Sequence, residues 1–530
     1  MDLKLSRSEQ AVRWCEFAGA GLITLLIVYF HIQFWRSAGP LWRDEVCSFN
    51  VATAGSLSEL SRLLPFENQP LLHYLILRGW CGLSLGATDI GLRALGLVIG
   101  LLLTGAIWLA CWLLNRTPPL WALTIFGLNP YLFRADSLRP HGLGLVWIVL
   151  TFAFVWQLTV QVSPRRSTIL FATLAAVLSV QTVFIEVIVV GAICAASATV
   201  FALNRNWRAI VLPLGIGLVS AASLIPYLGM IREAQQWNGI RAVVHSLGYT
   251  SAAFLQILTF GDVFIASVFV AIVLLAIACT VVPRLKERLS PVLAHGSERF
   301  TFAAVASLLA AVATFAFLWL LKFPLQDRYY LPLLAVVALS ITLVVSALRG
   351  SIPARATSLF ACLVLTTAFF PHAHNHTRIR LTNCDLAATA VAEAARADDL
   401  VLVTRFAYGI TFQRYYRGSV AWHAIPDIGD YSLFRWDLVK NAMEQPDPMH
   451  DLLVRAESTL RSAHRVFLVG PLGMQTREPS VVERSLNASR QQLIDLLNRH
   501  AQDAQNYSLP NSVVTDPVER LNVTVASGWR

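Results

Sequence analysis

Residues 94–114 read ALGLVIGLLLTGAIWLACWLL, a run that contains no charged side chain. A helix needs about 20 mostly apolar residues to cross the hydrocarbon core of a bilayer, so this run predicts a membrane-spanning helix. Comparable runs recur between residues 21 and 370, separated by short polar segments, whereas residues 377–530 contain none. The sequence therefore predicts a polytopic α-helical membrane part followed by a smaller soluble part.

The composition agrees with this division. Hydrophobic residues make up 56% of the chain and charged residues 14%, whereas an ordinary soluble domain has about 25% charged residues. The net charge of +10 does not indicate a nucleic-acid partner, because most basic residues lie in short segments between apolar runs, where they act as topology signals. The partner that the composition indicates is the lipid bilayer.

About eleven spans are expected. One apolar stretch, residues 168–203, would form a helix about 54 Å long at about 1.5 Å per residue, too long for a hydrocarbon core of about 30 Å. We therefore divide it at residues 181–186. Residues 71–86 are few and include charged Arg78, so we expect a helix that lies at the interface without crossing. The expected spans are 15–36, 90–114, 118–134, 140–160, 168–183, 187–203, 209–228, 262–283, 300–321, 329–348 and 356–372.

The basic residues indicate the orientation. If the N-terminus is cytoplasmic, the cytoplasmic segments hold fourteen Lys or Arg, and the longer outer loops hold fewer. Lys and Arg are retained on the cytoplasmic side during insertion, so this orientation is favoured. An odd number of spans then places residues 373–530 outside the cytoplasm, as a domain separate from the membrane domain of residues 1–372.

The acidic residues gather on the opposite, outer side, although they come from loops almost 300 residues apart. Carboxylates at a membrane surface cost desolvation energy unless they pair with cations or have a function. This gathering points to a functional site; for Asp44 and Glu45 the alternative is a solvated loop start paired with Arg43 or Arg62. The acidic residues of the outer side are Asp44, Glu45, Glu67, Asp136, Glu186, Glu233 and Asp327.

Other side chains of the outer loops suit anion or metal binding. Glu67 and His73 of the first loop could bind a metal or a phosphate. Arg139 offers a planar donor fork that suits phosphate oxygens, and it lies beside Asp136 and His141. The alternatives are solvated loop residues and interfacial arginines that extend toward water.

The loop after the ninth span adds Arg328 and Tyr329. Arg328 again offers a cation beside an acid, Asp327. Tyrosines at a membrane interface are usually part of an aromatic belt, which is the alternative interpretation for Tyr329.

Five sequence pieces, in this order, resemble the polyprenyl- or dolichyl-phosphate-sugar-dependent glycosyltransferases of the C superfamily. That superfamily includes protein O-mannosyltransferases and bacterial lipid A aminoarabinose transferases. The chain departs from it at Leu71, where the family often has a second proline, and at His141, where it often has tyrosine, so the subfamily and the acceptor stay open. The pieces are Trp42-Arg43-Asp44-Glu45, residues 68–74, residues 91–95, residues 137–142 and residues 327–332.

The resemblance implies a membrane glycosyltransferase that moves a sugar from a polyprenyl-phosphate donor to an acceptor hydroxyl on the outer face, with inversion. Asp44 would be the catalytic base, and Arg139 and Arg328 would stabilise the departing phosphate. Some relatives bind a divalent metal ion, for which Glu67 is the candidate ligand. The remaining expected substrate-binding residues are Glu45, Glu67, His73, Asp136, His141 and Tyr329.

The resemblance also places the chain in a bacterial inner (plasma) membrane. The acceptor is undefined: protein, lipid, cell-wall glycan and exopolysaccharide all fit. Two alternatives come from other functional classes, namely a transporter or lipid flippase, and an assembly factor without activity. Transporters usually carry functional charges near the bilayer midplane, whereas the spans here have almost no charge in their middle parts, which favours chemistry at the surface.

Residues 377–530 predict alternating helices and strands, which is typical of an α/β layer. Neither a phosphate-binding glycine loop nor a nucleophile elbow is found. Acceptor binding and a purely structural role are both open for this domain. The expected strands are 400–404, 465–470 and 521–525, and the expected helices are 385–397, 436–461 and 480–503.

Overall fold

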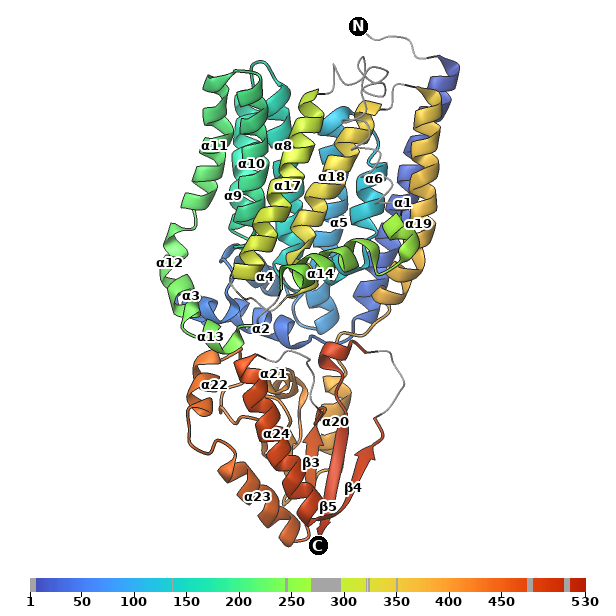
Figure 1. Cartoon of the computed structure of the whole chain (residues 1–530). Coiled ribbons are helices and arrows are strands. Elements are labelled where there is room, and N and C mark those ends of the chain that lie inside the picture. The colour runs from blue at the N-terminus through green and yellow to red at the C-terminus, as the bar shows by residue number, and fades with distance from the viewer. Residues whose placement is uncertain are drawn as a thin grey trace.

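The computed structural model describes residues 6–135, 137–243, 246–267, 297–320, 322, 325–348, 351–473, 480–509 and 515–530. A bundle of long helices adjoins a smaller C-terminal domain that contains a β-sheet, and the first helix, α1, begins at the end of the bundle remote from that domain (Figure 1). The predicted fold class, a helical membrane part followed by an α/β domain, is therefore confirmed.

Seven helices of the described part are long and apolar enough to cross a membrane. The residue before α1 shows why that helix begins where it does: the Ser6 hydroxyl accepts the N–H of Glu9, and Glu9 accepts the N–H of Ser6, which forms a capping box. Six of the seven are α1 (Arg7–Ser37), α5 (Asp89–Asn115), α8 (His141–Val160), α10 (Glu186–Leu203), α17 (Ser297–Leu320) and α19 (Ile352–Thr377), and the seventh is the stretch Trp207–Gln235, which contains α11 (Trp207–Ala222).

Two further apolar helices of the bundle, not counted among these seven, are α9 (Arg166–Val180) and α18 (Leu331–Leu348). The predicted division of residues 168–203 is confirmed, because α9 ends at Val180 and α10 begins at Glu186. No glycine or proline is needed at this turn, since the Gln181 side chain donates to the Ser223 carbonyl and accepts from the Tyr227 hydroxyl. Most of the predicted span 262–283, from residue 268 onward, lies outside the described residues.

The predicted span 118–134 is not one continuous α-helix. It consists of α6 (Leu120–Ala122), the π-helical turn η1 (Leu123–Gly127) and α7 (Pro130–Ala135). Proline lacks the N–H that a continuing helix requires, and Pro130 begins a new helix. Gly127 allows α1 to approach closely, because a Cβ there would lie 2.6 Å from Ile27 Cδ1.

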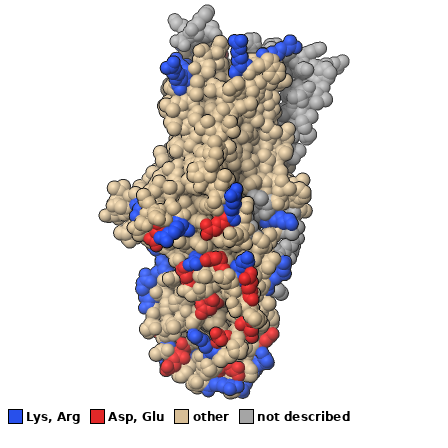
Figure 2. All heavy atoms as spheres, turned by 90° about the vertical axis from the view of Figure 1, so that its left-hand side faces the viewer, with Lys and Arg blue, Asp and Glu red and all other residues tan. Residues whose placement is uncertain are grey.

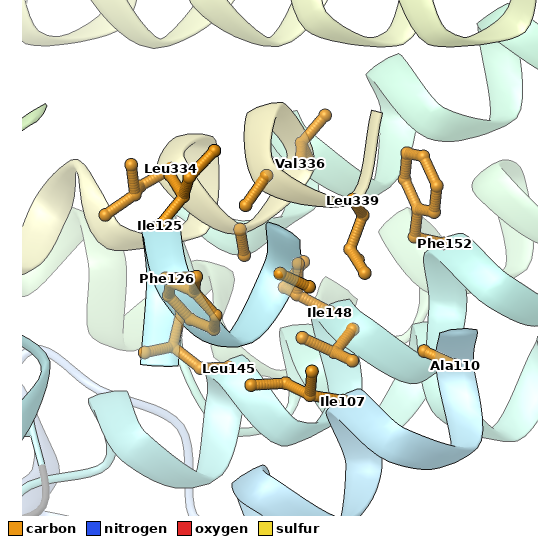
Figure 3. Packing of buried hydrophobic residues seen from close by; sticks show 14 of the residues in the cluster. Ile107, Ala110, Ile125, Phe126, Leu145, Ile148, Phe152, Leu334, Val336 and Leu339 are labelled. Carbon is orange, nitrogen blue, oxygen red and sulfur yellow. The ribbon is translucent and has the colours of Figure 1, made fainter. Parts of the chain in front are cut away.

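The bundle is held together by apolar side chains that interlock between helices. Figure 3 shows α18, through Leu334 and Leu339, packed against η1, α5 and α8. Within a bilayer such contacts stabilise the bundle mainly by van der Waals packing. Lipid tails are as apolar as leucine, so burying leucine between helices gains little from the hydrophobic effect. The packing places the ends of α5, α8 and α18 that carry polar residues at the same end of the bundle.

Short helices form a layer between the bundle and the C-terminal domain (Figure 1). As predicted, residues 71–86 do not form a spanning helix: α4 has 11 residues. A hydrophobic cluster ties the layer to the C-terminal domain, because Ile410 and Leu433 of that domain pack with Leu41, Val46 and other residues of the layer. The short helices are α2 (Arg43–Ala52), α3 (Leu57–Glu67), α4 (Leu72–Gly82), α12 (Leu228–Gln235), α13 (Asn238–Arg241) and α14 (Leu247–Thr259).

The C-terminal domain contains a five-stranded sheet with strand order β2-β1-β3-β5-β4. Strand β1 pairs in parallel with β2 and β3, and β5 pairs antiparallel with β3 and β4. The three predicted strands are present as β1 (Leu400–Val403), β3 (Val466–Val469) and β5 (Val523–Trp529), while β2 (Trp422–Ala424) and β4 (Ala501–Tyr507) were not expected.

Two predicted helices of this domain need correction. The segment 436–461 forms two helices, α22 (Trp436–Met443) and α23 (His450–Arg461), because the prolines at positions 446 and 448 interrupt it. The predicted helix 480–503 ends earlier, since α24 (Val481–His500) gives way to β4, which pairs with β5. The remaining helices are α20 (Cys384–Ala394), α21 (Phe406–Tyr415) and the short η4 (Pro517–Glu519).

The surface charges match the two-part architecture. On the face that Figure 2 shows, the middle of the bundle is almost free of charged side chains, and basic residues lie at the end remote from the C-terminal domain. Acidic and basic residues intermingle over the C-terminal domain and the layer of short helices. The basic residues at the remote end agree with the predicted cytoplasmic N-terminus.

Cysteine labelling tests the orientation. In a variant without native cysteines, we expect a membrane-impermeant thiol reagent to label Ser458→Cys, on α23, in intact cells, and Ser8→Cys, at the start of α1, only after permeabilisation. The reason is that α23 and the start of α1 lie at opposite ends of the molecule. Labelling of both cysteines, or of Ser8→Cys alone, in intact cells would contradict the orientation.

Candidate active site between the bundle and the C-terminal domain

A hollow of about 330 Å³ lies where the layer of short helices meets the C-terminal domain. Residues from both parts of the chain line it, which brings together most of the predicted site. The layer and the bundle contribute Trp42, Arg43, Asp44, Phe66, Glu67, Asn68, Gln69, Arg139, His141, Arg241, Val243, Gln326, Arg328 and Tyr329. The C-terminal domain contributes Arg405, Phe406, Ala407, Phe434, Trp436, Ser480, Val482 and Glu483.

Asp44 lies in the first turn of α2, where a negative charge is stabilised by the helix dipole. Its side chain is 8% exposed, and the two carboxylate oxygens contact different arginines. Arg328 Nη2 lies 3.1 Å from Oδ2, and Arg43 Nε lies 3.6 Å from Oδ1. Pairing of Asp44 with its neighbour Arg43 was the alternative to a functional role in the sequence analysis. The pair with Arg328, in contrast, joins segments almost 300 residues apart.

Burial alone would raise the pKa of Asp44, but the charges of Arg328, Arg139 and Arg43 outweigh it and lower the pKa below its ordinary value. The carboxylate is therefore ionised at neutral pH. It is a buried anion at the wall of the hollow, in the deprotonated form that a general base requires.

Arg139 connects α2 to α3. Its Nη1 donates to the main-chain oxygen of Asp44 at 2.9 Å and to Ser48 Oγ at 2.9 Å, and it pairs with Glu67. Glu67 receives this guanidinium, the Ser48 hydroxyl and the Tyr74 hydroxyl all on Oε2. Its other oxygen, Oε1, accepts no hydrogen bond from the residues described.

Each of the two predicted phosphate-binding arginines has one N–H donor that is not used within the described structure. The Nε atoms of Arg139 and Arg328 are buried and have no hydrogen-bond partner within the described ranges. A buried donor without a partner costs free energy, so an anion that accepted from both side chains would be favoured. Both arginines also line a second, smaller hollow, which includes Tyr131, Arg134 and Asp516.

Glu45 does not line the hollow. It is fully buried and receives Arg93 on both oxygens, at 2.8 Å and 2.6 Å, as well as the N–H groups of Leu138 and Trp42. Arg93 also donates to the carbonyls of Gly39 and Pro40. The structure thus gives Glu45 a position in which it holds α2 against α5, rather than the expected substrate contact.

His73 is likewise buried behind the hollow. Its Nε2 lies 3.4 Å from the Leu138 carbonyl, next to Arg139. Burial lowers the pKa of His73 to about 3, an effect that the charge of Arg139 strengthens, so the ring is neutral. Of the other predicted residues, His141 and Tyr329 line the hollow with their rings 6.0 Å apart, and Asp136 lies outside the described residues.

The C-terminal wall of the hollow is aromatic and cationic. Trp436 stacks on Phe434 with ring centroids 5.7 Å apart, and Arg241 of α13 lies 4.8 Å from the Trp436 ring centre. Arg43 lies 5.9 Å from the Phe434 ring centre. The sequence offered no sign of this wall, because its residues come from an unrelated part of the chain and become neighbours of Asp44 only in the folded protein.

A resident divalent ion is usually held by several carboxylate or carbonyl oxygens. Asp44 and Glu67 each already pair with an arginine. In the part of the chain that the structure describes, no group of three or more His, Cys, Asp or Glu side chains could hold a metal ion. The described side chains around Glu67 therefore do not form a metal site by themselves, and Asp136 lies outside the described residues.

Removal of one partner tests the buried pair of Glu45 and Arg93. We expect Glu45→Ala to leave the buried Arg93 without a counter-charge and to lower the free energy of unfolding by about 3–5 kcal/mol. Thermal unfolding in detergent micelles would show a lower Tm, and the double variant Glu45→Leu/Arg93→Met should recover part of the loss. An unchanged Tm for Glu45→Ala would contradict the positioning role.

No protein-family model and no curated protein sequence matches this chain. Solved structures do. ArnT from Cupriavidus metallidurans in the apo state superposes with a TM-score of 0.50 at 12% sequence identity, over 96% of this chain and 98% of that one. The same protein bound to undecaprenyl phosphate gives a TM-score of 0.48 at 12% identity, over 95% and 98%.

A third match is the archaeal oligosaccharyltransferase AglB from Archaeoglobus fulgidus, in complex with an inhibitory peptide and a dolichol-phosphate. Its TM-score is 0.47 at 12% identity, over 96% of this chain and 74% of that one. At such identities a structural likeness concerns the fold alone. The chain therefore has the fold of ArnT, a helical membrane part with a C-terminal sheet domain, along nearly its whole length.

Proposed function

We propose that the chain is a glycosyltransferase that moves a sugar from a polyprenyl-phosphate donor to an acceptor hydroxyl, with Asp44 as the general base. One observation carries the proposal: the buried, ionised carboxylate of Asp44 pairs with Arg328, while Arg139 holds the main-chain oxygen of the same residue, and each of these two arginines retains a buried Nε without a partner in the described structure. The ArnT-like fold and the family-like sequence pieces support it.

In the proposed reaction, the acceptor oxygen attacks the anomeric carbon of the donor while the bond from that carbon to the phosphate oxygen breaks. The acceptor proton passes to a carboxylate oxygen of Asp44. The polyprenyl phosphate leaves as an anion, stabilised by donors of Arg139 and Arg328. A single displacement inverts the anomeric centre, so a β-linked donor gives an α-linked product.

Arg328 has two tasks in this scheme. In the free protein its charge is one cause of the lowered pKa of Asp44, which makes the carboxylate a weak base. When Arg328 turns toward the donor phosphate, the added negative charge offsets the guanidinium and the basicity of Asp44 rises. Donor binding would thereby prepare the base for the acceptor.

Glu67, His141 and Tyr329 are the proposed contacts of the transferred sugar. Glu67 suits a sugar hydroxyl, because its Oε1 accepts no hydrogen bond from the described residues while its Oε2 is held by Arg139, Ser48 and Tyr74. His141 and Tyr329 line the same hollow and offer ring faces and polar atoms. We keep Asp136 as a proposed sugar ligand from the sequence.

The acceptor is proposed to bind between Asp44 and the C-terminal wall. Phe434 and Trp436 are half-buried, and aromatic rings of this kind give contact area at low entropic cost. This arrangement gives the C-terminal domain a role in acceptor binding. With the N-terminus cytoplasmic, the hollow and this domain lie on the outer face of what we propose is a bacterial inner membrane, with residues 1–372 and 373–530 as the two domains.

Asp44→Asn tests the base. We expect a roughly 100- to 10,000-fold loss of transfer, because the amide cannot accept the acceptor proton. The measurement is release of polyprenyl phosphate by protein in nanodiscs, offered a panel of polyprenyl-phosphate sugars and cell-envelope extract. Asp451→Asn, an exposed aspartate of α23, is the matched control and should transfer normally. Full activity of correctly inserted Asp44→Asn would reject the base role.

Trp436→Ala tests the acceptor wall. We expect the KM for the acceptor to rise about 2- to 10-fold, in line with the loss of one aromatic contact, while the KM for the donor stays within error. Trp529→Ala, in the last strand of the same domain, controls for general effects on folding. A rise in donor KM alone would assign this wall to the donor instead.

A further inference from the structure

The segment that leads into α2 has its N–H groups held by the C-terminal domain. The Leu41 N–H donates to the Tyr415 hydroxyl at 2.7 Å, and the Arg43 N–H donates to Glu519 Oε2 at 3.3 Å. Tyr415 in turn donates to Asp89 at the start of α5. The first N–H groups of a helix have no partner within the helix, so the bond from Arg43 to Glu519 satisfies a group of α2 that would otherwise lack a partner.

The sequence before α2 provides no ordinary cap. Trp42 occupies the N-cap position, and an indole can only donate a hydrogen bond. Glu45 accepts the Trp42 N–H from inside the helix, which leaves the Arg43 N–H to Glu519. A carboxylate at this position also suits the positive end of the helix dipole.

Glu519 is itself held rigidly. It ends η4, its side chain is fully buried, and its Oε1 accepts the Thr411 hydroxyl of α21 at 2.6 Å. The carboxylate therefore cannot move with α2 if the helix shifts, and it fixes the first turn of α2 relative to the C-terminal wall of the hollow. Asp44 is the next residue after Arg43 in that turn.

We propose that Glu519 is a positioning residue for the transfer reaction: it caps α2 from the other domain and thereby fixes Asp44 opposite the acceptor wall. This inference rests on the proposed function. It explains why a transferase of this design would need its C-terminal domain for turnover as well as for acceptor binding. Its effect should appear in kcat, because a misplaced base slows the chemical step without removing substrate contacts.

The cap should also respond to pH. Burial raises the pKa of Glu519 to about 7, although the charge of Arg43 and hydrogen bonds from Thr411 and Thr382 oppose the rise. The other ionisable group facing it is the Cys384 thiol of α20, whose pKa is raised well above its usual value by burial and by Glu519. As the pH rises through about 7, Glu519 ionises and becomes the stronger acceptor, so transfer should increase.

The test compares Glu519→Gln and Glu519→Ala in the full-length protein in nanodiscs. We expect Glu519→Ala to lower kcat roughly 2- to 30-fold, the range that loss of a helix cap implies, with both KM values within about twofold of wild type. Glu519→Gln keeps an acceptor oxygen and should lose less. Both variants should lack the rise of kcat near pH 7 that we predict for wild type.

Glu457→Gln, on the α23 surface, is the matched control, because its carboxylate pairs only with Arg461 in the described structure. A readout independent of catalysis is hydrogen–deuterium exchange of residues 41–47, which should be faster in Glu519→Ala. If Glu519→Ala barely folds, Thr411→Val, which removes only the hydroxyl on Oε1, should show the same effects in weaker form.

Unchanged exchange at residues 41–47, or a change in KM alone, would overturn the positioning role. If wild-type protein transfers no sugar at all, the proposed function fails. The exchange experiment then still decides whether Glu519 caps α2.

Discussion

Two adjacent carboxylates buried in the first turn of α2 impose the organisation of the whole outer face. A buried carboxylate is costly unless a cation and hydrogen bonds compensate it. Arg93 of α5 is the compensating cation for Glu45, and Arg328 and Arg43 are the compensating cations for Asp44. Because these partners come from different parts of the chain, the two carboxylates can be satisfied only when the bundle ends have assembled around α2.

The membrane part and the C-terminal domain divide this work. Packing of α5, α8 and α18 sets the spacing of the bundle ends. Arg93 of α5 then fixes the position of α2, because it binds Glu45 and the carbonyls of Gly39 and Pro40. From the other side, Tyr415 and Glu519 hold the main chain that enters α2. Glu45 is thereby structural and Asp44 remains at the hollow, although the two are neighbours in sequence.

Length, hydrophobicity and charge sign were sufficient to predict the membrane class, most helices, three strands and the gathering of Asp44, Glu67, Arg139 and Arg328. They could not separate Asp44 from Glu45, because which carboxylate receives Arg93 depends on the direction in which α2 faces. The break at η1 and strand β4 were missed, since their conformations depend on contacts with α1 and β5. Trp436 and Glu519 were also missed, because nothing local marks residues that act across a domain boundary.

The most direct measurement is a cryo-EM map of the protein in nanodiscs with bound polyprenyl phosphate. We predict phosphate density between Arg139 and Arg328, beside Asp44 and facing the wall formed by Phe434 and Trp436. We also predict that Arg328 has turned from Asp44 toward that phosphate. Phosphate density elsewhere, with the pair of Arg328 and Asp44 intact and the hollow empty, would contradict it.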